Sequence, residues 1–365
     1  MRLDNISLYN FRNYQKLNID LNEGLNFFVG NNGSGKTNLL EAIYFLALAK
    51  SYKTNETNLI RVNNQFARIS SHIINNQYSF DLKIIISEKG KKVLINDKKI
   101  KKLSDYIGNL KVLSFLPEDI MIIKSSPKDR RYFIDIIYGQ IDRYYLNELS
   151  NYKLLLKQRN ELLKQLTESD KPDMILLDVI TEQLSISAGK IISFRKGFVK
   201  QINNQLQSMY QFITDKKHDF VFTYNPSVEE NIEKVMKSKY KTDLLLGTTN
   251  IGPHRDDYEF LFDNLQAKNH ASQGEQRIMI LGLIFAIANI IYNNNKERPV
   301  FLLDDVFSEL DSIKQNKIIK YLIKLNAQTI ITTTSLKNIE KTILQDAKIF
   351  KIYNNAIREE QNARV

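Results

Sequence analysis

The sequence predicts an α/β fold that is organised around a nucleotide-binding loop and interrupted by a helical insertion. The first observation is a match to the phosphate-loop pattern G-x-x-x-x-G-K-[S/T], in Gly30-Asn31-Asn32-Gly33-Ser34-Gly35-Lys36-Thr37. Residues 25–29 before it form an apolar run that predicts a buried strand, and residues 38–49 after it are rich in good helix formers. The second observation is another apolar run, residues 300–303, which ends in Asp304 and Asp305.

The composition of the loop suits it to phosphate binding. Its glycines let backbone N–H groups turn toward phosphates, and the following helix N-terminus adds a partial positive charge. Lys36 can reach the terminal phosphates, and the Thr37 hydroxyl can ligate Mg²⁺. A chance glycine loop is the alternative, but the flanking strand and helix favour nucleotide binding. We therefore predict that all eight residues from Gly30 to Thr37 contact the nucleotide.

Asp304 and Asp305 are the candidates for the second half of the site. In phosphate-loop proteins such a strand lies beside the strand that carries the loop, and its first carboxylate holds the Mg²⁺ shell. The second carboxylate can orient or deprotonate the attacking water. An acidic turn after a buried strand is the alternative. We expect Lys36, Asp304 and Asp305 to be catalytic, with Thr37 and Asp304 at the metal. Lys36 and Asp304 lie 268 positions apart (304 minus 36), so a large segment is inserted between them.

A second helix N-terminus follows the pattern of an anion site. Ser272 is a plausible cap for a helix over residues 278–292, which makes Ser272, Gln273 and Gly274 candidates for phosphate contact. One nucleotide does not need two such ends in one subunit. We therefore expect a composite site, with this second end supplied by another copy of the chain.

Composition narrows the class of protein. The chain has 365 residues, 43% hydrophobic and 25% charged, so two soluble domains are expected. It has no cysteine, which excludes disulfides, thiolate metal sites and cysteine nucleophiles and suits a cytoplasmic location. The most apolar run, residues 280–292, is too short to span a bilayer, and no membrane association is expected. The net charge of +11 favours an anionic partner such as nucleic acid, although a lysine-coated surface would give the same value.

Short alternating runs at residues 66–74, 78–86 and 92–95 predict antiparallel strands, with a hairpin turn near Asn96 and Asp97. Residues 89–102 carry seven lysines. They are either a solvated edge that prevents aggregation or a patch that contacts phosphates. The candidate DNA contacts are Lys98, Lys99, Lys101 and Lys102, with Arg12 as a further candidate.

The middle of the chain predicts an antiparallel helical arm. Residues 141–166 form a helix with an apolar stripe that Arg159 interrupts, residues 169–173 break it, and residues 174–213 form a second helix punctuated by Gly189. The stripe is expected to be the packing seam of the two helices, with a partner-binding face as the alternative. We place the arm domain at 126–214 and the nucleotide-binding domain at 1–125 plus 215–365. His254 could be a catalytic base, but a structural histidine is the more common case.

The order of these parts resembles the ABC-type ATPase heads of the SMC family, and within it a branch of bacterial DNA replication and repair proteins. The stretches that carry the resemblance are residues 10–14, 30–42, 115–119, 126–135, 158–160, 252–257, 272–277 and 304–311. They span nearly the whole chain in the family's order. The long coiled coils and zinc hook of the DNA-tethering members are missing from the sequence.

The resemblance implies an α/β, ABC-type (SMC-like) phosphate-loop ATPase head with an inserted helical arm domain. It implies ATP and Mg²⁺ as cofactors, an ATP-dependent homodimer, and weak DNA-stimulated hydrolysis used as a switch. The implied partners are DNA, as duplex and gapped or single-stranded junctions, other recombination mediator proteins, and the recombinase that assembles on single-stranded gaps.

Three positions depart from the family's pattern. Asp305 stands where ABC heads usually keep a glutamate, Thr334 where many keep a switch histidine, and Glu118 near the usual Mg²⁺-contacting glutamine. The first two departures fit a weak ATPase. Two other functions remain open: a non-hydrolysing, nucleotide-stabilised DNA clamp, and the ATPase subunit of a membrane transporter, in which the arm has no role.

Overall fold

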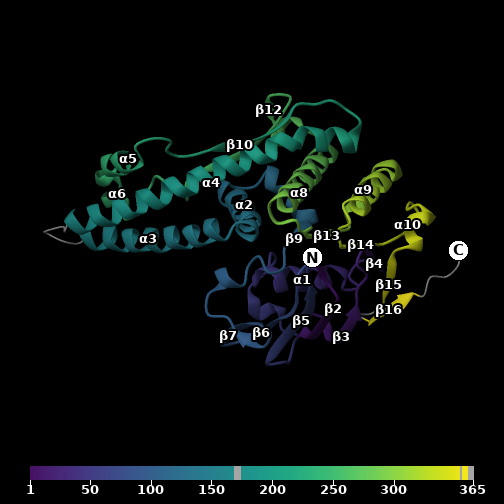
Figure 1. Cartoon of the computed structure of the whole chain (residues 1–365). Helices are drawn as coiled ribbons and strands as arrows, with labels where there is room; N and C mark the ends of the chain where they lie inside the picture. Colours follow the sequence, from purple (N-terminus) through teal and green to yellow (C-terminus); the bar gives the residue numbers. More distant parts are fainter. Residues whose placement is uncertain (168–173, 354–355, 361–365) are drawn as a thin grey trace. The chain divides into compact units, whose positions relative to one another are not determined.

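The structure is a computed structural model that describes residues 1–167, 174–353 and 356–360 (Figure 1). The predicted helix break at 169–173 and the side chain of Glu118 lie outside the described part of the chain. The chain divides into two compact units. Unit 1 comprises Met1–Met121, Ser208–Lys217 and Ser272–Val365, and unit 2 comprises Ile122–Gln207 and His218–Ala271.

The first sheet of unit 1 is a seven-stranded antiparallel sheet in the order β3-β2-β5-β6-β7-β8, with β1 on β5. Its strands are β1 (Arg2–Leu3), β2 (Asn5–Phe11), β3 (Tyr14–Asp20), β5 (Phe66–Ile74), β6 (Ser79–Ser87), β7 (Gly90–Ile95) and β8 (Lys98–Lys99). Buried and exposed residues alternate along β5 and β6, as expected when one face packs on a core and the other meets water. The predicted antiparallel strands are confirmed.

The predicted hairpin turn joins β7 to β8. Ile95 pairs with Lys98 across a two-residue turn, and Asn96 and Asp97 have φ angles of 48° and 61°. Two consecutive residues with positive φ define the turn that matches the twist of a hairpin, and asparagine and aspartate tolerate this conformation. Because side chains alternate along a strand, Lys98 and Lys99 project to opposite faces of the sheet.

The second sheet of unit 1 is mostly parallel and has the order β16-β15-β4-β14-β13-β9. Its strands are β4 (Leu25–Val29), β9 (Val112–Phe115), β13 (Val300–Asp304), β14 (Thr329–Thr333), β15 (Lys348–Tyr353) and β16 (Ala356–Glu360). Every residue of β13 and β14 is buried, as is typical of parallel strands covered on both faces.

This strand order corrects one prediction. The strand that ends in Asp304 is not beside the strand that carries the loop, because β14 lies between them. Thr329 of β14 pairs with Leu25 of β4 on one side and with Phe301 of β13 on the other. The loop and the carboxylates therefore follow strands that are separated by one strand, β14, and they lie at the same edge of the sheet.

The helices of unit 1 connect and cover its strands. They are α1 (Lys36–Leu48), α8 (Gln273–Asn295), α9 (Ser312–Lys324) and α10 (Lys341–Gln345), with short 3-10 turns η1 (Glu56–Leu59), η2 (Leu103–Asp105), η3 (Pro117–Ile123) and η4 (Val306–Glu309). Helix α1 packs against β13 and β14. By length and apolar composition α8 alone among the described helices could cross a membrane, but 72% of its most apolar window is buried inside the protein. We therefore regard it as a core helix.

Unit 2 contains a helical hairpin and a small antiparallel sheet. Its elements are α2 (Pro127–Ile141), α3 (Arg143–Thr167), α4 (Met174–Thr214), β10 (Phe220–Asn225), α5 (Ile232–Ser238), α6 (Tyr240–Leu246), β11 (Asp257–Phe262), β12 (Leu265–Gln266) and α7 (Ala267–His270). The final residues of α4 belong to unit 1. Unit 1 and the predicted head differ most in residues 218–271, which belong to unit 2, where β11 packs against α2. Smaller differences are residues 122–125, which belong to unit 2, and residues 208–214, which belong to unit 1.

The two long helices differ from prediction at their boundaries. The helix expected from residue 141 begins at Arg143, because Asp142 is extended (φ −125°) and its carboxylate accepts the backbone N–H of Tyr145. Helix α4 runs through Gly189 without a break. The apolar stripe of α3 is buried except for Leu156, which is partly exposed, and Arg159, which interrupts the stripe, is fully buried.

Candidate nucleotide site

The phosphate loop connects β4 to α1 and needs glycine at three of its positions. A Cβ atom at Gly30 would lie 2.6 Å from the carbonyl oxygen of Ile352, too close for any side chain. Gly33 and Gly35 have φ angles of 79° and 105°, which side chains rarely adopt. The glycine pattern is therefore explained by close approach of β15 and by backbone conformation.

Lys36 folds back onto the loop. Its Nζ donates hydrogen bonds to the carbonyl oxygens of Gly30, at 2.5 Å, and Asn31, at 2.9 Å, and the residue is 7% exposed. Burial lowers the pKa of Lys36, while Asp305 and Asp304 act in the opposite direction. The ammonium group is thus fixed at the loop with two carboxylates close enough to stabilise its charge.

Thr332, on the intervening strand β14, holds both carboxylate residues in place. Its hydroxyl donates to Oδ1 of Asp304 at 2.5 Å, and Asp304 is 5% exposed. The backbone N–H of Asp305 donates to the carbonyl oxygen of Thr332 at 3.2 Å and to its hydroxyl at 3.1 Å. Asp305 itself has a φ of 48°, so the chain turns sharply at the end of β13. The inserted strand therefore positions the carboxylates as well as separating them from β4.

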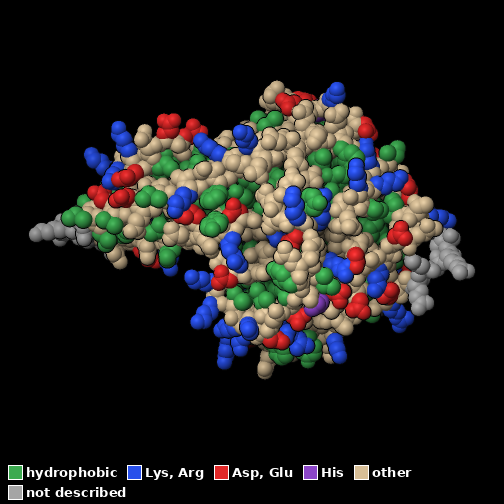
Figure 2. All heavy atoms as spheres, viewed as in Figure 1, with side chains coloured by type: hydrophobic (Ala, Val, Ile, Leu, Met, Phe, Trp, Pro, Cys, Tyr) green, Lys and Arg blue, Asp and Glu red, His purple; other side chains and the backbone are tan. Residues whose placement is uncertain are grey.

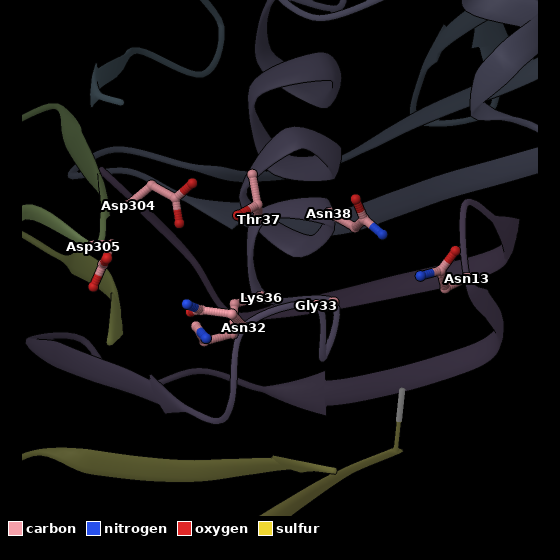
Figure 3. Close-up of a pocket in the computed structure, with 9 residues that line it drawn as sticks. Asn13, Asn32, Gly33, Lys36, Thr37, Asn38, Asp304 and Asp305 are labelled. Carbon is pink, nitrogen blue, oxygen red and sulfur yellow. The ribbon is translucent and has the colours of Figure 1, made fainter. Parts of the chain in front are cut away.

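The loop and the carboxylates line one pocket of about 480 Å³ (Figure 3). Its lining residues are Asn13, Asn32, Gly33, Gly35, Lys36, Thr37, Asn38, Asp304 and Asp305. In Figure 3 the carboxylate of Asp304 points toward Thr37, and Asn13 lies at the opposite end of the pocket. The structure therefore brings together the predicted catalytic residues and most of the predicted loop residues. Gly30, Asn31 and Ser34 belong to the loop but not to this lining.

Asn13 and Asn38 also line the pocket, although neither was assigned a role from the sequence. Asn38 directly follows the fixed positions of the motif in the first turn of the helix, so its place in the sequence was a sufficient signal to predict that it lines the pocket. Asn13 comes from the turn between β2 and β3. The neighbouring Tyr14 is buried, and its hydroxyl donates to the carbonyl oxygen of Gly35 at 3.1 Å, which brings this turn to the loop.

The donor set of this pocket fits Mg²⁺. It offers a buried carboxylate at Asp304 and a hydroxyl at Thr37 on facing elements. No group of three or more acidic, histidine or cysteine side chains that could hold a metal occurs among the described residues. Two protein oxygens with the remainder supplied by phosphate and water is the usual way in which proteins hold Mg²⁺.

The Ser272 cap is formed as predicted. The hydroxyl of Ser272 accepts the backbone N–H of Glu275 at 3.3 Å, and the Glu275 carboxylate accepts the backbone N–H of Ser272 at 2.8 Å, a complete capping box. Ser272, Gln273 and Gly274 are exposed and do not belong to the pocket lining. Within one chain, the second helix end is thus separate from the loop.

The candidate DNA contacts have different environments. Lys98, Lys99, Lys101 and Lys102 are all exposed. Arg12 has an internal partner instead: its Nε and Nη2 donate to the two carboxylate oxygens of Glu41 at 2.9 and 3.0 Å, and Glu41 is fully buried. Removing Arg12 would leave a buried charge, so the structure gives this residue a structural role that the sequence did not suggest.

His254 has the structural environment that was expected as the common case. Its Nε2–H donates to the carbonyl oxygen of Thr249 at 2.8 Å, and its Nδ1 accepts the hydroxyl of Tyr152 at 2.7 Å. Burial lowers the pKa of His254 to about 4, so the ring is neutral at physiological pH. Thr334, at the expected switch position, is exposed just beyond the end of β14.

Fold and site together define an SMC-type ABC ATPase head. The structure is similar to the Smc head domain with an extended coiled coil from Pyrococcus furiosus, with a TM-score of 0.55 and 19% identity over 98% of this chain and 95% of that one. At this identity the likeness establishes the fold alone.

Sequence comparison gives the particular family. The model of the RecF/RecN/SMC N-terminal domain matches residues 2–359. The DNA replication and repair protein RecF of Lactobacillus johnsonii is 38% identical over 99% of this chain and 100% of that protein. The structure of the recombination mediator protein RecF with ATP in the RecFOR pathway has a TM-score of 0.89 and 29% identity, over 98% of this chain and 99% of that one. The chain belongs to the RecF family of DNA replication and repair proteins.

Proposed function

We propose that this protein is an ATP-dependent DNA-binding protein of recombinational repair and replication restart. It dimerises on ATP, hydrolyses ATP slowly, and promotes loading of the recombinase at single-stranded gaps together with other mediator proteins. The observation that carries this proposal is the single pocket that unites Lys36, Thr37, Asp304 and Asp305. The ATP complex of a RecF relative with the same fold supports ATP as the nucleotide.

The roles follow from the positions of the groups. Lys36 binds the terminal phosphates, and the Thr37 hydroxyl and Asp304 carboxylate hold Mg²⁺, which neutralises charge on the β- and γ-phosphates. Thr332 keeps the Asp304 carboxylate oriented toward Thr37. Asp305 is assigned to orient the attacking water. An aspartate is one methylene shorter than the glutamate usual in ABC heads, so it reaches the water less well, which is consistent with slow hydrolysis.

Dimerisation is assigned to the exposed cap of α8. Ser272 and Gly274 present a helix N-terminus to solvent, and a second subunit that places this end on the γ-phosphate would complete the site. ADP lacks the phosphate that such a contact needs. The exposed lysines of the β7–β8 hairpin and the residues after it are assigned to DNA phosphates, with little sequence preference.

Analytical sedimentation with ATP, with ADP and with a gapped duplex tests this function. ATP is expected to convert monomer to dimer and ADP is not, and the ATP dimer is expected to sediment with the gapped duplex. Ser272→Arg should block dimerisation by placing a bulky, charged side chain at the proposed interface between the two subunits. Ser312→Arg, at an exposed serine in the first turn of α9, is the matched control and should dimerise normally.

Mixing experiments test whether the site is shared. A mixed dimer of Ser272→Arg and Lys36→Met keeps one site intact and damages the other twice, so mixing two inactive variants should restore part of the ATP turnover. An ADP dimer equal to the ATP dimer, or no recovery when both folded variants are mixed, would contradict the proposal.

A further inference from the structure

The solvent face of the seven-stranded sheet carries a row of side chains that crosses five strands. Strand register places Lys16 beside Tyr9, Tyr9 beside Arg68, Arg68 beside Ile85 and Ile85 beside Lys92. We call this row the outer sheet row. All five side chains lie on the face opposite the core, because the residues before and after them on β2, β5 and β6 are buried.

An aromatic pair lies in and beside this row. Tyr9 stacks on Phe66, with ring centroids 5.6 Å apart and planes 27° apart, and Phe66 is 42% exposed. The guanidinium of Arg68 lies 5.7 Å from the centroid of the Tyr9 ring. Solvated sheet faces normally carry threonine, serine or charged residues, so a partly exposed stack of two rings flanked by an arginine needs an explanation.

The charges of the row are of one sign. Lys16, Arg68 and Lys92 have no carboxylate partner among the residues that the structure describes. The acidic groups on this sheet lie outside the row: Asp97 is paired with Lys83, Asp81 is paired with His72, and Asp20 lies at the end of β3, four residues from Lys16. In Figure 2, lysine and arginine side chains gather over the region where Figure 1 places β6 and β7. The row therefore offers three unpaired positive charges around the stacked rings.

We propose that the outer sheet row, with Phe66, is a binding site for single-stranded nucleic acid. Unpaired bases have exposed faces that can extend the Tyr9–Phe66 stack, and Lys16, Arg68 and Lys92 match the phosphates between them. A duplex keeps its bases stacked on one another and would use only the charges. An acidic peptide would also use the charges but gains less from flat aromatic surfaces.

The dimensions of the row suit a short stretch of strand. Lys16 and Lys92 are separated by four inter-strand steps of about 4.8 Å, which gives about 19 Å. Sheets that present aromatic side chains in this way stack two or three bases. All the residues belong to one sheet of one protomer, so this site needs neither ATP nor a second subunit. It therefore goes beyond the ATP-dependent function proposed above.

A fluorescence experiment can place the ligand on the row. The chain has no tryptophan, so Tyr9→Trp creates a single tryptophan within the row. We expect an oligothymidylate of about ten nucleotides, added without ATP, to quench this emission through base stacking. Tyr78→Trp is the matched control, since Tyr78 is an exposed tyrosine (58%) in the turn between β5 and β6, outside the row, and its emission should not change.

Binding measurements then separate stacking from charge. Tyr9→Leu and Phe66→Leu keep apolar volume but remove the rings, and each should weaken binding of the oligothymidylate by about 5- to 150-fold. Replacing Lys16, Arg68 and Lys92 together with Gln should reduce the log–log salt slope by about 2. Replacing Lys234, Lys239 and Lys241, three exposed lysines of unit 2, removes the same charge and should leave binding to the row unchanged.

Several outcomes would overturn the proposal. In the fluorescence assay, they are an absence of quenching in Tyr9→Trp, or quenching by a blunt duplex of the same length equal to that by the oligothymidylate. In the binding assays, they are displacement of the oligothymidylate by poly-glutamate as effective as by unlabelled oligothymidylate, or leucine variants that bind the oligothymidylate as tightly as the parent does. Circular dichroism confirms that each variant is folded. In the Lys36→Met background, which is not expected to bind ATP, we expect the same quenching of Tyr9→Trp emission. Failure of the ATP-dependent function and failure of this site are therefore distinguishable.

Discussion

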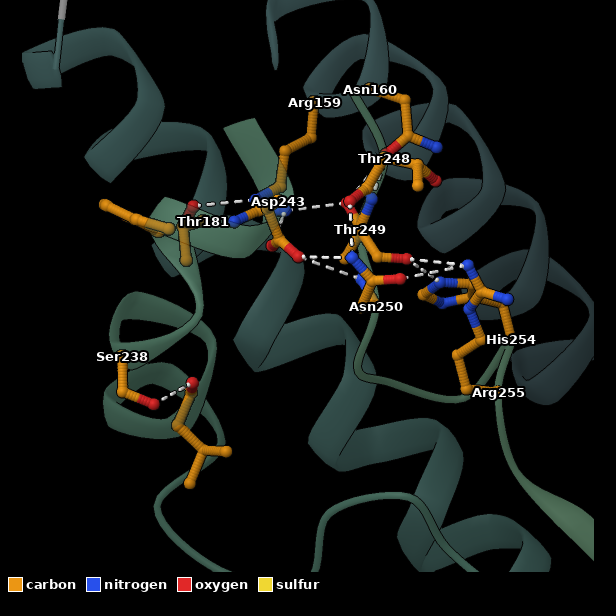
Figure 4. Close-up of polar contacts among 12 residues, drawn as sticks. Arg159, Asn160, Thr181, Ser238, Asp243, Thr248, Thr249, Asn250, His254 and Arg255 are labelled. Carbon is orange, nitrogen blue, oxygen red and sulfur yellow. Dashed lines mark hydrogen bonds and ion pairs between the residues drawn. The ribbon is translucent and has the colours of Figure 1, made fainter. Parts of the chain in front are cut away.

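The nucleotide pocket of unit 1 and the arginine clusters of unit 2 are both built from stretches that resemble family motifs, yet they use their polar groups differently. In the pocket, Thr37 and Asp304 point toward a shared space (Figure 3). In unit 2, Arg159, Asn160 and His254, from the stretches 158–160 and 252–257, bond instead to internal partners such as Asp243 and Thr249 (Figure 4). The comparison shows that a motif can mark a ligand site or an internal joint, by which we mean a buried polar cluster that connects helices and strands. Burial and hydrogen-bond partners distinguish the two.

Arg159 is the centre of one such joint. It is fully buried on α3, and its Nε donates to the hydroxyl of Thr181 on α4 at 2.9 Å. Its Nη1 donates to Asp243 of α6 at 2.8 Å and to the hydroxyl of Thr249 at 2.7 Å. One side chain therefore ties both long helices to the segment between α6 and β11.

Arg195 of α4 is the centre of a second joint. Its Nη1 donates to Asp256 at 3.0 Å and to the carbonyl oxygen of Pro253 at 2.8 Å, and its Nη2 donates to Asp135 of α2 at 2.9 Å. Tyr224 of β10 also donates to Asp256. The charged groups compensate one another inside the unit, which leaves little capacity for an external ligand.

The largest expected effect is on ATP turnover at the pocket. Asp305→Asn should lower turnover by about 10²- to 10⁴-fold while ATP still binds, because the phosphate and metal groups survive and the water loses its acceptor. Lys36→Met should abolish ATP binding. Phosphate release and equilibrium binding of labelled ATP measure the two effects. If Asp305→Asn hydrolysed ATP at the parent rate, Asp305 would have a structural role and would not orient the attacking water.

Unit 2 should respond in stability. Arg195→Met should lower the free energy of unfolding by about 3–5 kcal/mol, because it leaves the fully buried Asp256 and the largely buried Asp135 without their cation. The adjacent Lys196→Met is the control: Lys196 is exposed in a long 3.7 Å ion pair, so its loss should cost about 1 kcal/mol or less. Urea unfolding followed by circular dichroism measures both. Equal destabilisation by the two variants would contradict the proposal that the buried Arg195 cluster stabilises unit 2 more than a surface ion pair does.

The smallest expected effect is a pH dependence at His254. Its pKa falls from the ordinary 6.5 to about 4 through burial, so between these values the unfolded chain binds the proton and the folded chain does not. Stability is therefore complete above pH 6.5 and falls as the pH drops toward 4, by up to about 3 kcal/mol at about 1.4 kcal/mol per pKa unit.

His254→Gln keeps a donor and an acceptor but does not titrate. The drop in urea midpoint between pH 7.5 and pH 5 should therefore be smaller in this variant than in the parent. An identical drop in both proteins would assign the pH dependence to other groups.

Local patterns predicted a large part of this molecule. The phosphate loop, the Asn96–Asp97 turn and the Ser272 cap are each specified by a few adjacent residues, and the structure has all three. The composite ATP site and the roles of its residues remain proposals, because they depend on a ligand and a second subunit.

Long-range pairing is what the sequence did not reveal. The position of β14 between β4 and β13, and hence the role of Thr332, depends on which parallel strands pair, and strand pairing leaves no local pattern. Arg159 appeared as an interruption of an apolar stripe because its partner Asp243 is 84 positions away. The burial of Glu41 against Arg12 was hidden for the same reason.

The insertion of unit 2 into the chain also has a consequence for synthesis. Both neighbours of β4 in the sheet, β14 and β15, come late in the chain, and 300 residues separate Val29 from Thr329 (329 minus 29). At roughly 5–20 residues per second, the ribosome needs about 15–60 s to cover that distance. The seven-stranded sheet can form once Lys99 has emerged, but the apolar strand Leu25–Val29 has no partner until the end of translation is near. The nascent protein therefore passes through a long interval in which this strand is available to chaperones and to other unfolded chains.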